Sequence, residues 1–171
     1  MRVALQPYDK PSLRAMRTVQ AAIRREFGIE SVVLPVRKLP QSAWYAPRGR
    51  WRADKLLQDL SSIKGYDRVL GLTASDISTT LGDHKDWGVF GLGQMPGKAC
   101  ILSTFRLNRR VERVSPTERL KRVAYHELGH TLGLRHCSSR PCLMNDAEGS
   151  IKSVDATNRF CESCSRRLGR S

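Results

Sequence analysis

The order of the expected strands and helices predicts an α/β fold. Apolar runs of strand length alternate with segments of helical periodicity, in the order 3–6 (strand), 12–27 (helix), 31–36 (strand), 53–63 (helix) and 67–73 (strand). The chain has 171 residues, 40% of them hydrophobic, which is enough to bury a core. We expect one domain over residues 1–171, with an α/β part at 1–133 and a small C-terminal part at 134–171.

The helix over 12–27 is the clearest element of the first half. Apolar residues recur there at helical spacing, and Gly28 is suited to end the helix in a left-handed conformation. The strands at 3–6 and 31–36 flank it, as in a βαβ unit. Residues 41–52 contain Pro47 and Gly49 and are expected to form a loop.

Two further strands are expected at 87–94 and 99–104, joined as a hairpin by the turn at 95–98. Cys100 lies in the second of these apolar runs and is interpreted as a small core residue. The sequence Ser115-Pro116-Thr117-Glu118 is a capping box with proline at the first helical position. It predicts a helix over 116–132, ending before Gly133.

This last helix carries the most informative pattern in the chain. His126 and His130 are four residues apart, so a helix presents both imidazoles to one point, as zinc ligands require. Glu127 is offset by one residue and suits a general base, while Gly133 lets the chain turn so that His136 becomes a third ligand. The alternative is a helix with surface histidines and no metal.

A three-histidine site has a specific chemical consequence. Three neutral ligands leave the fourth zinc position to water, and zinc lowers the pKa of that water to about 7. A site of this composition therefore catalyses hydrolysis.

The cysteines form a second pattern. Cys137 follows the third histidine directly, Cys142 comes after a short loop, and Cys161 and Cys164 form a C-x-x-C near the end of the sequence. Two pairs of thiols at this separation are typical of a closed four-thiolate zinc site. A pair of disulfides is the alternative, disfavoured because no secretory signal is visible.

The combined pattern resembles the archaemetzincins, a group of metzincin zinc peptidases. The positions that carry the resemblance are His126, Glu127, His130, Gly133, His136, Met144, Cys137, Cys142, Cys161 and Cys164. The resemblance implies a metzincin-like twisted mixed β-sheet, an active-site zinc helix, and a small C-terminal part with a methionine turn and a four-cysteine zinc site. It also implies that the strand at 89–93 pairs with extended substrate, although an ordinary glycine-containing hairpin explains Gly91 and Gly93 equally well.

We therefore predict a zinc metallopeptidase with two zincs per chain, one catalytic and one structural. Glu127 would deprotonate the zinc-bound water and pass the proton to the leaving amine of a peptide or protein substrate. Endopeptidase and aminopeptidase modes both stay open, because the sequence indicates no acidic group for a substrate amine.

The net charge of +14 supports a rival interpretation, a non-catalytic zinc-stabilised module that could bind nucleic acid. The excess is spread along the chain, and its densest cluster comprises Arg106, Arg109, Arg110 and Arg113. The intact Glu127 favours the enzyme over the module. No apolar stretch is long enough to span a membrane, and we expect a cytoplasmic monomer.

Overall fold

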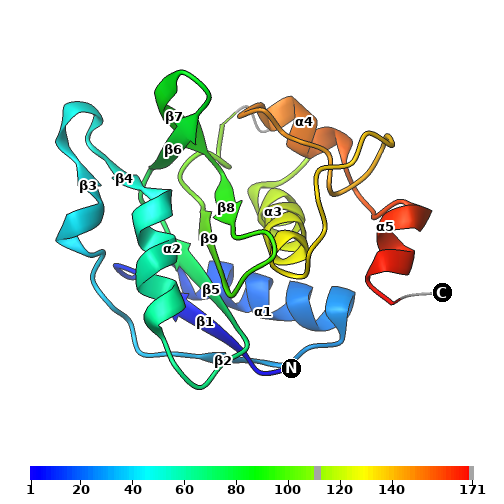
Figure 1. Cartoon of the computed structure of the whole chain (residues 1–171), viewed down its shortest axis with the longest axis horizontal. Helices are drawn as coiled ribbons and strands as arrows, with labels where there is room; N and C mark the ends of the chain where they lie inside the picture. Colours follow the sequence, from blue (N-terminus) through cyan, green and yellow to red (C-terminus); the bar gives the residue numbers. More distant parts are fainter. Residues whose placement is uncertain (110–112, 170–171) are drawn as a thin grey trace.

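A five-stranded sheet forms the centre of the computed structural model, which describes residues 1–109 and 113–169 (Figure 1). In spatial order its strands are β2 (Ser31–Val33), β1 (Val3–Pro7), β5 (Arg68–Thr73), β9 (Ala99–Ser103) and β8 (Gly91–Gly93). The first four run parallel, whereas β8 pairs antiparallel with β9 and forms one edge. The predicted α/β fold with a mixed sheet is confirmed.

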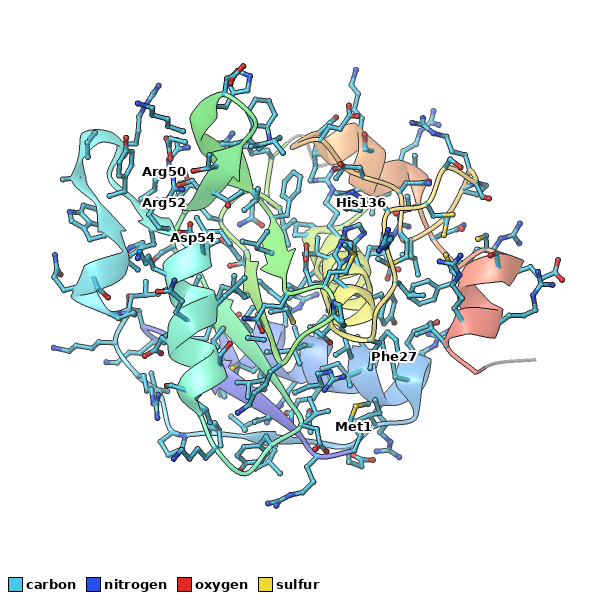
Figure 2. All side chains as sticks on the ribbon, viewed as in Figure 1. Met1, Phe27, Arg50, Arg52, Asp54 and His136 are labelled. Atoms are coloured by element: carbon cyan, nitrogen blue, oxygen red, sulfur yellow. The ribbon has the colours of Figure 1, made fainter. Side chains whose placement is uncertain are left out.

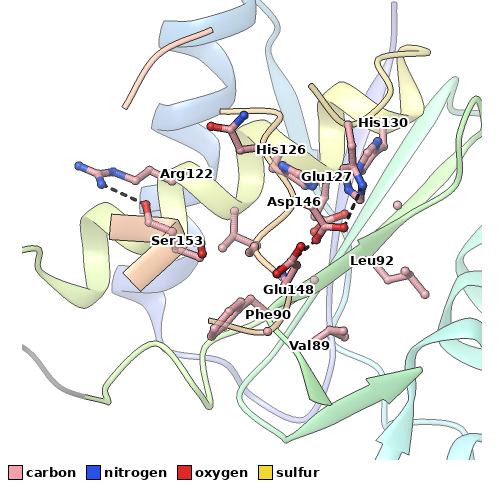
Figure 3. A pocket seen from close by; sticks show the side chains of 18 of the residues that line it. Val89, Phe90, Leu92, Arg122, His126, Glu127, His130, Asp146, Glu148 and Ser153 are labelled. Atoms are coloured by element: carbon pink, nitrogen blue, oxygen red, sulfur yellow. Dashed lines mark hydrogen bonds and ion pairs between the residues drawn. The ribbon is translucent and has the colours of Figure 1, made fainter. Parts of the chain in front are cut away.

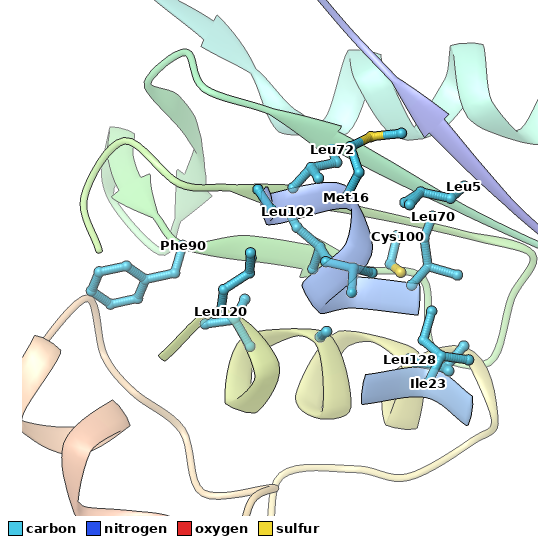
Figure 4. Close-up of a cluster of buried hydrophobic side chains, with 14 of the residues drawn as sticks. Leu5, Met16, Ile23, Leu70, Leu72, Phe90, Cys100, Leu102, Leu120 and Leu128 are labelled. Carbon is cyan, nitrogen blue, oxygen red and sulfur yellow. The ribbon is translucent and has the colours of Figure 1, made fainter. Parts of the chain in front are cut away.

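Helices cover both faces of this sheet. The helices α1 (Leu13–Phe27) and α3 (Pro116–Thr131) pack on one face, and α2 (Ala53–Ser62) packs on the other (Figure 1). Side chains alternate accordingly along each strand, since Leu70 contacts the α1 and α3 side while Val69 contacts the α2 side. The α1 and α3 side includes Leu5, Leu70, Leu72, Leu102 and Cys100, which are all fully buried (Figure 4).

The helix ends follow the local sequence signals. Ser12 caps α1 by accepting the N–H of Ala15 at 3.1 Å, and Gly28 ends it with a φ of 65°. Ser115 caps α3 by accepting the N–H of Glu118 at 3.2 Å, with Pro116 in the first turn. The predictions for these two helices are therefore confirmed.

A second, four-stranded sheet was not predicted. Its order is β3 (Trp44–Tyr45), β4 (Arg50–Arg52), β6 (Ile77–Leu81) and β7 (His84–Val89). The expected loop at 41–52 contains β3 and β4, together with 3-10 turns at Gln41–Ala43 and Ala46–Arg48.

Two strand predictions need correction. The expected strand at 87–94 is divided at Phe90, because Val89 pairs with Ile77 of β6 in the second sheet whereas Gly91 pairs with Leu102 of β9 in the first. The strand expected at 31–36 ends at Val33, although the chain stays beside β1 and the N–H of Arg37 donates to the carbonyl oxygen of Pro7.

The chain beyond α3 lies along that helix and contains α4 (Ile151–Ala156) and α5 (Glu162–Arg167) (Figure 1). It forms its own apolar cluster against Tyr125 of α3, with Leu134, Met144 and Phe160 buried. His136 lies on the segment that leaves α3, on the side facing α4 (Figure 2). Among the described residues, the helices lack the combination of length and apolar composition that crossing a membrane requires.

Candidate active site

Three histidines meet at the C-terminal half of α3. The helix places the Nε2 atoms of His126 and His130 at a separation of 3.0 Å. Gly133, with a φ of 94°, lets the chain turn after the helix so that His136 approaches the same point. One ring nitrogen from each histidine lies within 4.8 Å of the others. The structure thus brings together the three histidines expected from the sequence.

Hydrogen bonds orient these rings. The Nδ1 atom of His126 donates to the carbonyl oxygen of Leu143 at 2.7 Å, and that of His130 donates to the carbonyl oxygen of Leu134 at 2.7 Å. The Nδ1 atom of His136 lies 3.2 Å from a carboxylate oxygen of Asp146. Each ring therefore keeps its Nε2 atom for the shared centre, the arrangement that orients histidine ligands at metal sites.

The protonation states suit the same purpose. Burial, reinforced by the neighbouring His130, lowers the pKa of His126 to about 3, and burial also lowers the pKa of His130. Both rings are therefore neutral near pH 7, as metal ligands must be. The donor set and its orientation fit a zinc ion.

Glu127 lies beside the histidines and is only 7% exposed. Burial raises the pKa of its carboxyl group to about 8, and the nearby Asp146 carboxylate acts in the same direction. The strand β8 packs directly on it, since a Cβ added at Gly91 would lie 2.6 Å from the Cγ of Glu127. A Cβ at Gly93 would lie 2.7 Å from the backbone oxygen of Glu127. Both glycines are thus required for the contact between β8 and α3.

The four predicted cysteines form a second cluster. The Sγ atoms of Cys137 and Cys161 are 3.7 Å apart, those of Cys142 and Cys164 are 3.8 Å apart, and all four lie within 4.8 Å of one another. These separations far exceed the roughly 2.05 Å of a disulfide, and the four cysteines are free. A backbone hydrogen bond from Cys164 lowers the pKa of Cys161 to about 7, whereas burial raises the pKa of Cys142 and of Cys164, so a bound zinc ion would be needed to hold all four thiols as thiolates. The histidine and cysteine groups could together hold two zinc ions.

Met144 is fully buried and packs on α3. A Cβ added at Gly129, the residue before His130, would come within 2.8 Å of its Sδ atom. The backbone oxygen of Met144 accepts the N–H of Cys137 at 2.9 Å. The methionine turn is therefore the segment that connects the two clusters.

A cavity of about 310 Å³ opens over the histidines and Glu127 (Figure 3). One side is formed by β8 and by Trp87 and Leu81 of the second sheet, and the other by Val154 and Thr157 at α4. Figure 3 shows Asp146 and Glu148 directed toward Glu127 and His130, while Arg122 points toward α4. The cavity has the size and the mixed apolar and polar lining of a small-ligand or peptide site.

Sequence reasoning missed several of these residues. Asp146 follows Met144 by two positions, but only the folded loop reveals that it supports His136. Glu148 and Arg122 line the cavity without any motif to indicate it. Gly91 and Gly93 also pack closely on Glu127, a reason for these glycines beyond the two that the sequence offers, an approaching substrate backbone or an ordinary hairpin.

Comparisons with known proteins agree with this geometry. The sequence profile of Peptidase family M54 matches residues 14–170. An archaemetzincin of Methanopyrus kandleri is 36% identical over 140 residues, covering 78% of this chain and 74% of its own. An archaemetzincin of Halobacterium salinarum is 29% identical over 178 residues, covering 98% of this chain and 99% of its own.

Solved structures give the same result. The crystal structure of the Methanopyrus kandleri archaemetzincin matches with a TM-score of 0.83 and 33% identity, over 99% of this chain and 93% of that one. The archaemetzincin of Archaeoglobus fulgidus, crystallised with malonate, matches with a TM-score of 0.82 and 27% identity, over 98% and 99%. The resemblance inferred from the motif is confirmed, and the non-catalytic alternative gains no support. The chain belongs to peptidase family M54, the archaemetzincins, and is a zinc metalloprotease.

Proposed function

We propose that His126, His130 and His136 hold the catalytic zinc and that Glu127 transfers the proton during peptide hydrolysis. The observation that carries this assignment is the convergence of one ring nitrogen from each of three histidines beside a buried carboxyl group in one cavity. When bound at such a site, zinc polarises a carbonyl group and makes water more acidic. Cys137, Cys142, Cys161 and Cys164 would hold the structural zinc.

We propose that the Glu127 carboxyl group alternates between a protonated and an ionised state. With a pKa of about 8, its carboxyl group is protonated near pH 7 in the absence of a cation. A dication beside it lowers that pKa, so Glu127 becomes an ionised proton acceptor when the site is loaded. It would then return the proton to the leaving amine, and the packing of Gly91 holds its carboxylate in place for both transfers.

We propose that β8 binds the substrate backbone. It lies at the end of the five-stranded sheet and pairs with β9 on one side, so its other edge is not paired with a strand among the described residues. The residues Gly91–Gly93 also line the cavity, next to Glu127. An extended peptide added to this edge would pass over the catalytic group.

The four-cysteine cluster is proposed to support the catalytic site rather than to take part in the chemistry. It fixes Cys137, which follows His136, and Cys142, which precedes the Leu143 carbonyl group that orients His126. A structural zinc bound there would contribute folding free energy directly.

Glu127→Gln tests the central assignment. Glutamine keeps the size of the side chain but does not accept the proton, so cleavage of a peptide library should fall about 10²–10⁴-fold while both zincs stay bound. Glu30→Gln, a charge change at an exposed position outside the cavity lining, should leave cleavage near the parental rate. Parental cleavage by the zinc-loaded Glu127→Gln protein would contradict the assignment.

A further inference from the structure

A second hollow, of about 260 Å³, borders the catalytic cavity. The two share Phe90 and Gly149 as lining residues. The remaining lining comes from the turn after β9 and from the start of α4: Arg106, Arg109, Ser150, Ile151 and Lys152. We call this space the basic hollow. Arg106 and Arg109 belong to the arginine cluster that precedes α3 in the sequence, and the proposed catalytic step does not involve them.

The basic hollow and the catalytic cavity differ in the charged side chains that line them. Among the described residues, the basic hollow is lined by three cationic side chains and by no acidic one. Asp76 compensates Arg106 through two hydrogen bonds, of 2.6 Å and 3.0 Å, which leaves Arg109 and Lys152 as exposed cations. The catalytic cavity, in contrast, contains the carboxyl groups of Glu127, Asp146 and Glu148. Negative groups are therefore favoured in the basic hollow.

Buried interactions fix both walls of the hollow. Arg119 is fully buried and donates to the carbonyl oxygens of Leu107 and Arg109, at 2.8 Å and 2.6 Å. The same guanidinium group binds both carboxylate oxygens of Asp155 on α4, at 2.7 Å and 2.6 Å. Arg119 thus connects the segment that contains Arg109 to α4, the helix that carries Lys152.

The side chain of Arg106 is also fixed by its contacts, with Asp76 and with the backbone at Gly88. Its guanidinium group lies against the backbone of β7, since a Cβ added at Gly88 would lie 2.1 Å from its Cζ atom. The hollow is therefore a preformed feature of the fold, with the exposed cations Arg109 and Lys152 on a frame held by buried interactions.

We propose that the basic hollow is a subsite for a carboxylate group of the peptide substrate, either an acidic side chain or the C-terminal carboxylate. The proposal rests on the peptidase function proposed above and specifies its substrate class. A peptide in the catalytic cavity has only to pass Phe90 and Gly149 to place a carboxylate between Arg109 and Lys152. Acidic peptides would then be bound through the hollow while their scissile bond lies at Glu127.

The test starts from one peptide that the zinc-loaded enzyme cleaves. Glutamate, glutamine and lysine are placed in turn at three positions on each side of the scissile bond, and the C-terminus is prepared as acid and as amide. Glutamate at one position, or the free acid, should lower KM about tenfold relative to its neutral counterpart, because two exposed ion pairs contribute about threefold each. The effect should vanish near 1 M salt, where the screening length is about 3 Å.

The double variant Arg109→Gln/Lys152→Gln should abolish the preference for the carboxylate and leave kcat for the neutral peptide unchanged. The matched control is Arg14→Gln/Arg17→Gln, which removes the same charge from the exposed face of α1 and should keep the preference. Cleavage with no charge preference at any position, or an equal loss in both double variants, would overturn the subsite while leaving the peptidase assignment intact.

Binding provides a readout that does not require turnover. A labelled acidic peptide should bind the zinc-loaded Glu127→Gln protein, measured by fluorescence anisotropy, about tenfold more tightly than its glutamine counterpart. This difference should disappear in the Arg109→Gln/Lys152→Gln background. If that background instead loses affinity for a single-stranded RNA while the two peptides bind equally, the hollow recognises phosphate and the proposal is wrong. Acidic-peptide binding that depends on Arg109 and Lys152, with no cleavage of any peptide, would support the subsite and count against the proposed catalysis.

Discussion

The Nδ1 atom of His126 lies 2.7 Å from the carbonyl oxygen of Leu143, the residue between Cys142 and Met144. The Leu143 carbonyl group thus orients a ring of the histidine cluster, and Leu143 directly follows Cys142 of the cysteine cluster. Asn145 strengthens this segment, because its amide donates to the carbonyl oxygen of Cys137 at 2.6 Å and its oxygen accepts the N–H of Cys142 at 3.0 Å. Hydrogen bonds within residues 137–145 and from His126 therefore connect the two clusters.

Removing one thiol should release one zinc and destabilise the chain. Cys161→Ser is expected to lower the zinc content from two ions per chain to one and to lower the melting temperature, because a structural zinc contributes folding free energy. Metal analysis and thermal unfolding measure both effects. Cys100→Ala, a change to the buried cysteine of β9, should keep two zincs. A Cys161→Ser protein that melts like the parent but no longer cleaves peptides would reverse the proposed roles of the two sites.

Loss of the Asp146 carboxylate should weaken the histidine site selectively. Asp146→Ala removes the partner of the His136 Nδ1 atom, and substitutions of this kind reduce metal affinity about 10–100-fold. Competition with a chromophoric chelator would measure the affinity of each site separately. Asp146→Asn keeps an oxygen acceptor and should lose less. An unchanged affinity in the alanine variant would show that Asp146 does not support the ligand.

A methyl group at position 91 should impair catalysis more than metal binding. The added Cβ of Gly91→Ala would lie 2.6 Å from the Cγ of Glu127, so either β8 or the glutamate must move. We expect kcat to fall at least tenfold and the free energy of unfolding to fall by about 1–3 kcal/mol, the usual range for overpacking. Zinc content should remain at the parental value. Retention of full kcat would mean that the position of the carboxylate tolerates a shift.

The ion pair between the fully buried Arg119 and the half-buried Asp155 should be important for stability. Arg119→Met leaves Asp155 and the carbonyl oxygens of Leu107 and Arg109 without their donor, and breaking such a pair costs about 3–5 kcal/mol. Urea unfolding measures the loss. The double variant Arg119→Met/Asp155→Leu should recover part of it, because no unpaired carboxylate is then left. Additive losses in the two single variants and the double variant would argue against a direct interaction.

Elements with local signals could be predicted from the sequence. Ser115 and Pro116 fix the start of α3, and the spacing of His126 and His130 on that helix fixes their common direction. Gly133 predicts the turn that brings in His136. These features depend on residues within one or two helical turns of each other, so the local sequence is sufficient to predict them.

Elements defined by distant partners could not be predicted. The change of sheet at Phe90 depends on β6 and β9, which lie on opposite sides of it in the sequence. The two short strands β3 and β4 form only because β6 offers a partner edge to β4. Asp146 and Glu148 follow the methionine turn in an unremarkable polar stretch, and only the folded loop aims them at the cavity.

The glycines of β8 also determine where side-chain selectivity can reside. Gly91 and Gly93 face α3, whereas Leu92 between them packs on the opposite side with the α2 cluster. At these two positions the proposed substrate strand has no side chain with which to distinguish one peptide residue from another, and Leu92 is the β8 side chain that lines the cavity. Discrimination among peptides would then depend on Trp87 and Leu81 on the second sheet, on the segment leading into α4, and on the proposed subsite at Arg109 and Lys152. Exchanging those walls, with β8 left untouched, is the route by which this scaffold could acquire new sequence preferences.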